Sequence, residues 1–136
     1  MTHVLLVGGD VALLEGLAQS LAAQGHAPAV ATSLAEAREV AMSQPPLVLV
    51  VNRVLASSAG AELLAIPLAA GGARLLYRAA AVPLAPLLPA LQRAVLADLT
   101  LPLERHRLAA LVQSLGERAR ATGRDVRPMT REVRAP

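Results

Sequence analysis

The sequence contains no cysteine and no lysine, and Tyr77 is its only aromatic residue. Without cysteine the chain can form neither a disulfide framework nor a thiolate metal site. Without aromatic side chains to stack on bases, binding to single-stranded nucleic acid is not expected. Hydrophobic residues make up 54% of the chain, yet no apolar run reaches the roughly 18 residues of a membrane-spanning helix. With no basic and apolar leader either, we expect a cytoplasmic protein that does not enter membranes.

Positive charge gathers near the C-terminus. Residues 1–115 carry seven arginines and seven acidic residues, whereas residues 116–136 carry six arginines and three acidic residues. Such arginines could contact DNA phosphates, but they alternate with acids and prolines, and no recognition helix accompanies them. We therefore expect a single domain over residues 1–121 and a disordered, arginine-rich tail over 122–136. Nucleic-acid binding is not expected of this domain alone.

Short aliphatic runs bounded by turn residues predict buried strands. The clearest runs are Val4–Val7 and Leu47–Val51, and shorter strands are predicted at 29–31, 74–78 and 98–101. Helices are predicted from Asp10, whose carboxylate would cap the first, and from Ser33, where Ser-x-x-Glu has the form of a capping box. Further helices are predicted at 61–69, 86–95 and 104–121, with a loop at 55–58. This alternation of strand and helix is typical of an α/β fold with a parallel sheet.

In a parallel α/β sheet, functional groups lie at the carboxyl ends of the strands. Gly8 and Gly9 follow the first predicted strand, Asn52 ends the third and Arg78 ends the fourth. The glycine pair lacks the three-glycine spacing of a dinucleotide site and the Gly-Lys of a phosphate loop, so we interpret it as a tight turn. Arg53 is interpreted as a solvated loop residue. For Arg78 an anion-binding or ion-pairing role and a solvated role both stay open.

Four landmarks in this order resemble the receiver domain of bacterial response regulators. The match extends from residue 3 to about residue 121. Its landmarks are Val4-Leu5-Leu6-Val7-Gly8-Gly9-Asp10, Asn52-Arg53-Val54-Leu55 with Gly60-Ala61-Glu62-Leu63-Leu64, Arg78-Ala79, and Leu99-Thr100-Leu101-Pro102-Leu103. The resemblance implies a flavodoxin-like sheet of five parallel strands in the order 2-1-3-4-5, with helices on both faces.

The chain departs from the receiver pattern at the positions that carry phosphoryl transfer. A receiver accepts phosphate on an aspartate, beside an acidic pair that binds Mg²⁺. Here the resemblance places Gly8 and Gly9 at the acidic pair, Asn52 at the acceptor, Arg78 at the Thr/Ser hydroxyl and Leu101 at the lysine. Asp10 alone cannot replace the lost ligands, and an amide is not a competent nucleophile. We therefore expect no Mg²⁺, no other metal, no cofactor and no enzymatic activity.

Arg78 is expected to fill the former phosphorylation pocket. As the residue at the end of the fourth strand, it would reach over the site and contact Asp10 or Asn52, because a buried guanidinium needs acceptors. Such a contact would replace the cation and the phosphoryl group and hold the loops in one state.

The resemblance implies a pseudo-receiver in signalling: a phosphorylation-independent module that binds a protein partner or a second copy of itself. Receivers commonly pair through the fourth helix, fifth strand and fifth helix, and two-fold pairing would bring each patch against its own copy. The candidate interface residues are Leu84, Leu87, Leu88, Leu91, Arg93 and Asp98, with Arg93 and Asp98 expected to pair between copies. Two alternatives stay open: a sensor that binds a small ligand or anion in the former pocket, and the N-terminal part of a longer DNA-binding regulator.

Overall fold

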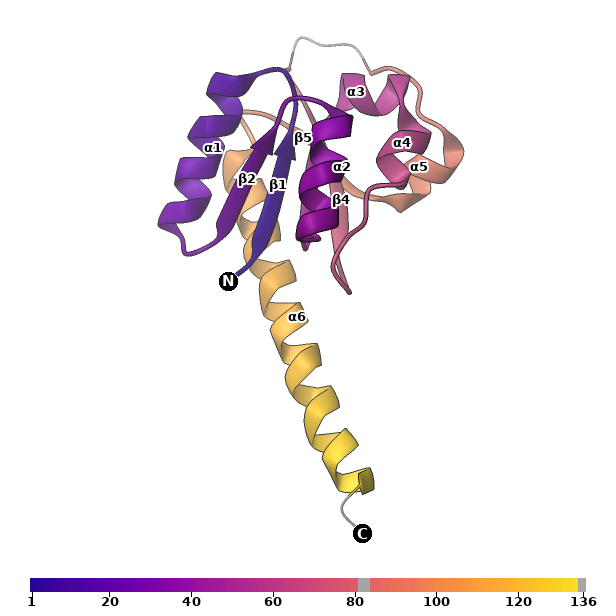
Figure 1. Cartoon of the computed structure of the whole chain (residues 1–136). Coiled ribbons are helices and arrows are strands. Elements are labelled where there is room, and N and C mark those ends of the chain that lie inside the picture. The colour runs from indigo at the N-terminus through magenta and orange to yellow at the C-terminus, as the bar shows by residue number, and fades with distance from the viewer. Residues whose placement is uncertain (81–83, 135–136) are drawn as a thin grey trace.

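The computed structural model describes residues 1–80 and 84–134, with side chains described as far as residue 122. Its centre is a sheet of five parallel strands in the order β2-β1-β3-β4-β5, as predicted (Figure 1). The strands are β1 (His3–Val7), β2 (Ala27–Ala31), β3 (Val48–Asn52), β4 (Ala73–Arg78) and β5 (Val95–Thr100). The helices are α1 (Val11–Ala23), α2 (Leu34–Ser43), α3 (Arg53–Ser58), α4 (Gly60–Leu64), α5 (Pro89–Ala94) and α6 (Arg105–Arg134).

Alternation along the strands divides the core into two layers, one on each face of the sheet. Leu6, Val50 and Tyr77 pack with α1 and α6, whose buried residues include Leu14, Leu17, Leu108 and Val112. Leu5, Val51 and Leu76 pack on the opposite face with residues of α2, α3, α4 and α5. Both faces of β1 and β3 are thus buried, which explains why the sequences of these two strands are unbroken aliphatic runs.

The two predicted helix caps differ in outcome. Ser33 caps α2 as predicted, since its Oγ accepts from the Glu36 N–H at 3.1 Å. The Glu36 carboxylate does not complete a capping box with Ser33; it accepts from the Thr32 N–H and hydroxyl. Asp10 occupies the cap position of α1, but its carboxylate makes no capping hydrogen bond, so that prediction was wrong.

Proline explains two of the helices whose bounds were misjudged, α4 and α5. The predicted helix 61–69 is shorter, because α4 ends at Leu64 before Pro67, and the residue before a proline avoids helical backbone. Arg74 donates to the carbonyls of Leu64 (3.2 Å) and Ile66 (3.1 Å) at that end. The predicted loop 55–58 is the helix α3. The predicted helix 86–95 is only α5, which begins at Pro89, a favoured first position, and leads directly into β5 at Val95.

The last helix, α6, is longer than expected. Leu108, Val112 and Leu115 are buried, so the first half of α6 packs on the sheet. The backbone then continues as helix to Arg134, where the sequence predicted a disordered tail from residue 122. Figure 1 shows this second half extending away from the rest of the domain. No helix in residues 1–80 or 84–134 is long and apolar enough to cross a membrane.

Candidate functional site

The strand ends that carry the predicted site lie side by side. Val7 of β1 pairs with Val51 of β3, and Asn52 pairs with Tyr77 of β4. The turn after β1 therefore meets the carboxyl ends of β3 and β4. The structure thus brings Gly8 and Asn52 together, as predicted, and adds a residue that the prediction did not include. That residue is Tyr77, one position before Arg78.

Tyr77 fills the space beside Gly8. A Cβ atom placed on Gly8 would lie 2.0 Å from Tyr77 Oη, 3.2 Å from Tyr77 Cζ and 3.3 Å from Asn52 Cβ. Real side chains do not approach so closely, so residue 8 must be glycine while Tyr77 keeps this position. A Cβ on Gly9, in contrast, would meet nothing within 4 Å. The chain bends at the glycine pair, and only the first glycine is required by packing.

The hydroxyl of Tyr77 is buried without a hydrogen-bond partner among the described residues. The side chain is 1% exposed. Burial raises the pKa of this phenol, an effect that the Asn52 amide opposes and the charge of Asp10 reinforces. Only the Asn52 amide N–H could stabilise an ionised phenol, since its Oδ1 is an acceptor and accepts the Val54 N–H. The space beside Gly8 is thus occupied by the phenol of Tyr77, and a carboxylate at position 8 would meet that phenol rather than solvent.

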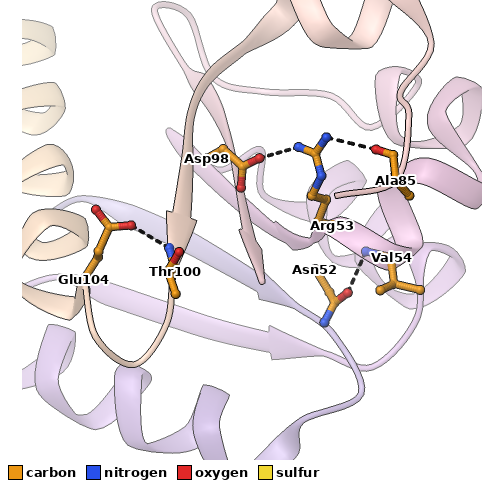
Figure 2. A network of polar contacts seen from close by, with 7 residues as sticks. All are labelled: Asn52, Arg53, Val54, Ala85, Asp98, Thr100 and Glu104. Carbon is orange, nitrogen blue, oxygen red and sulfur yellow. Dashed lines mark hydrogen bonds and ion pairs between the residues drawn. The ribbon is translucent and has the colours of Figure 1, made fainter. Parts of the chain in front are cut away.

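Asn52 has a structural role at the start of α3. Its Oδ1 accepts the Val54 N–H at 2.8 Å, which caps the helix (Figure 2). Asparagine is among the residues best suited to this position, because its side chain satisfies a helical N–H that would otherwise lack a partner. The sequence could have indicated this cap, since Asn followed by an apolar stretch is a start signal for a helix.

Arg78 ends β4, and its carbonyl accepts the Leu101 N–H at 3.0 Å. The side chain is partly exposed and engaged in an interaction of its own. Its contact with Asp10 or Asn52 stays a prediction, but the space beside Gly8 is filled by Tyr77. Leu101, at the lysine position, is 2% exposed and belongs to the core with α1 and α6. It contributes packing and no charge to the strand ends.

Glu104 joins the end of β5 to the start of α6 (Figure 2). Its Oε1 accepts the Thr100 N–H at 2.7 Å and its Oε2 accepts from Arg107 at 3.2 Å. The hydrogen bond from Thr100, with smaller contributions from Arg107 and Arg78, lowers the pKa of this carboxyl group. No group of three His, Asp or Glu side chains able to hold a metal ion occurs in the part of the chain that the structure describes.

Arg53 was misjudged as a solvated loop residue. It is the first residue of α3, and its side chain forms an ion pair with Asp98 of β5 and donates from Nη2 to the Ala85 carbonyl at 3.0 Å (Figure 2). Only 14% of the Arg53 side chain and 33% of the Asp98 side chain are exposed. Asp98 therefore already has an arginine partner within its own chain, and the pair between Arg93 and Asp98 of two copies stays a prediction.

Some of the candidate interface residues are exposed at the surface, whereas one, Leu91, is buried in the core. Leu84 and Leu88 are 61% and 49% exposed, Leu87 is partly buried and Arg93 is exposed. Leu91 is completely buried in the core, so it cannot belong to a surface. Leu96, which the sequence reasoning missed, is 55% exposed on the edge strand β5. A cleft of about 360 Å³ is lined by Arg53, Leu84, Leu87, Gln92, Val95, Leu96, Ala97 and Asp98.

No protein-family model matches the chain, and no curated protein matches it. Solved structures do. A CheY-like response regulator receiver domain from Methanospirillum hungatei JF-1 is 15% identical, with a TM-score of 0.63 over 89% of this chain and 98% of that one. One from Methylobacillus flagellatus is also 15% identical, with a TM-score of 0.67 over 85% and 98%. This chain has the receiver fold.

A protein described as an enzyme, not as a response regulator, has a similar fold. An adenylate cyclase from Rhodopirellula baltica is 15% identical, with a TM-score of 0.67 over 95% of this chain and 97% of that one. At these identities the likeness concerns the fold, and function has to be argued from the residues of this chain. In this chain the ends of β1 and β3 meet at Gly8 and Asn52, with the buried ring of Tyr77 beside Gly8.

Proposed function

We propose that this chain is a receiver-fold signalling module that works without phosphoryl transfer, as a protein-interaction domain that associates with a second copy of itself. The close contact between Gly8 and Tyr77 is the observation that supports a function without phosphoryl transfer. A divalent cation such as Mg²⁺ requires oxygen ligands, and the phenol stands where a side chain of residue 8 would have to pass. Asn52, the acceptor position by resemblance, supplies an amide that already caps α3.

The exposed leucines beside β5 support association with a second copy. Leu84, Leu88 and Leu96 are each about half exposed or more, and Leu84 and Leu96 line the same cleft. Full burial of a leucine side chain contributes about 1.5–3 kcal/mol relative to exposure. Residues 1–115 carry equal numbers of arginines and acidic residues, so two copies meeting here do not repel each other through net charge. A two-fold axis would place each patch against its own copy.

Association is tested by light scattering over a range of protein concentrations. The native chain should show a dimer, and Leu88→Glu should raise the dissociation constant about tenfold or more, because losing 1.4 kcal/mol of binding energy is a factor of ten. Met42→Glu is the matched control, since Met42 is 67% exposed on α2. It should associate like the native chain. A native monomer at high concentration would refute the association, and so would equal behaviour of the two variants.

A further inference from the structure

Arg53 connects three separate parts of the chain. It belongs to the start of α3, while its two polar partners are Asp98 in the middle of β5 and Ala85 in the segment before α5. Because β4 lies between β3 and β5, the guanidinium spans a strand to reach Asp98. Figure 2 shows the side chain between the carboxylate and the carbonyl, with one terminal nitrogen directed at each. Only the planar guanidinium offers two such donors in a fixed geometry.

Burial makes the three-part contact costly to break. Arg53 Nε and Asp98 Oδ1 are buried without a partner among the described residues, so each charge depends on the bonds that it does make. Removing one member of a largely buried ion pair leaves an uncompensated charge with little access to water. The contact therefore differs from the other described ion pair, Arg107–Glu104, whose side chains are 53% and 36% exposed.

The contact is also part of the exposed apolar surface. Arg53 and Asp98 line the same cleft as Leu84, Leu87 and Leu96, and Ala85 directly follows Leu84. Segment 84–88 contains no helix or strand of its own, and α5 after it has only six residues. Such a segment has few backbone hydrogen bonds that fix its position. We therefore expect the charge-assisted hydrogen bond from Arg53 to the Ala85 carbonyl to be one of the main interactions that hold it in place.

We propose that Arg53, held by Asp98, is a permanent clamp that fixes segment 84–88 against β5 and so presents Leu84 and Leu88 without an input signal. The negative charge that holds Arg53 comes from Asp98 of the same chain. In a signalling switch, the corresponding charge would come from a bound ligand or a modification. Arg53 acts here as a positioning residue for the surface. The consequence for association rests on the proposed function, whereas the clamp itself is independent of it.

Hydrogen exchange, followed by mass spectrometry on peptides covering residues 84–98, tests the clamp. Asp98→Ala should increase exchange of the Gln92 N–H by about tenfold or more, because this N–H donates to the Leu88 carbonyl at 2.9 Å and loses that partner when segment 84–88 moves away from β5. Arg107→Ala, which breaks the exposed pair, is the control and should leave the Gln92 N–H at the native rate. Native exchange in Asp98→Ala would overturn the proposal, as would an equal increase in both variants.

A second variant keeps the test decisive if Asp98→Ala fails to fold. Arg53→Lys retains the charge but can serve only one of the two partners, so exchange of the Gln92 N–H should increase while α6 stays at the native rate. Native exchange of the Gln92 N–H in Arg53→Lys would overturn the clamp. Light scattering then separates the two proposals: a native chain that never associates refutes the proposed function, while the exchange result still decides the clamp.

Discussion

Replacing Gly8 with aspartate, the residue type that the receiver resemblance places there, should destabilise the domain by about 3 kcal/mol or more, because overpacking costs about 1–3 kcal/mol and a buried, unpaired carboxylate adds to it. The physical reason is the 2.0 Å approach that a Cβ on Gly8 would make to Tyr77 Oη, with Asn52 Cβ at 3.3 Å on the other side. Tyr77 Oη cannot move aside easily, because the ring that carries it is 1% exposed and packed in the core. Urea unfolding followed by far-ultraviolet circular dichroism measures the loss.

Gly9→Asp is the matched control for Gly8→Asp. The two glycines are adjacent, and neither adopts a positive φ, so the comparison reports on space rather than on backbone conformation. A Cβ on Gly9 meets nothing within 4 Å and the residue is exposed, so the change in the free energy of unfolding should stay within about 0.5 kcal/mol. Equal losses at the two positions would contradict the assignment of Tyr77 to the space beside Gly8.

Shortening Tyr77 should produce an equally large effect. The ring is 1% exposed and packs in the core layer of α1 and α6, and truncation of a buried aromatic side chain to alanine costs about 3–5 kcal/mol. Tyr77→Phe retains the ring and removes a hydroxyl that has no described hydrogen-bond partner. Its free energy of unfolding should therefore stay within about 1 kcal/mol of native or rise, because no satisfied hydrogen bond is lost.

The two positions should also be coupled energetically. Gly8→Ala should cost less in a Tyr77→Phe background than in the native chain, because the atom nearest to the new methyl group has been removed. For residues in contact, such a double-mutant cycle gives an interaction energy of about 0.5–3 kcal/mol. Strict additivity would mean that the tyrosine hydroxyl does not occupy this space. A marked loss in Tyr77→Phe alone would mean that the hydroxyl is bonded, with Asn52 the nearest candidate.

The strands of this fold could be predicted because the residues of each strand and its flanking turns are enough to indicate it. Val4–Val7 and Leu47–Val51 are short, continuous and flanked by turn residues, and burial on both faces of a parallel sheet selects that pattern. The order 2-1-3-4-5 then followed from the resemblance and is the order observed. Helix bounds were less predictable, because Pro67 and Pro89 act on the residues around them in opposite ways, one limiting a helix and the other starting one.

The site could be located from the sequence, but its content could not. Gly8, Asn52 and Arg78 were placed at the strand ends by their position after aliphatic runs. What fills the space between them depends on which face of β4 each residue occupies, and Tyr77 lies on the α1 and α6 face, one residue before Arg78. The Arg53–Asp98 pair joins residues 45 positions apart in the sequence. The spacing of charged residues along a sequence does not predict which of them pair over such a separation. Leu91 and Leu88 likewise differ in burial through packing alone.

In the proposed function, the site that resembles a receiver's phosphorylation site is closed by the packing of Tyr77 beside Gly8 as well as by the loss of its nucleophile. Asn52→Asp tests it most directly, because a carboxylate can keep the cap on the Val54 N–H and so preserve the fold while restoring an acceptor. Intact mass is measured after incubation with Mg²⁺ and acetyl phosphate, for the native chain and the variant. We predict no phosphoryl adduct on either. An added phosphoryl group on the variant at position 52 would refute this closure, because it would show that Tyr77 leaves room for metal and phosphate.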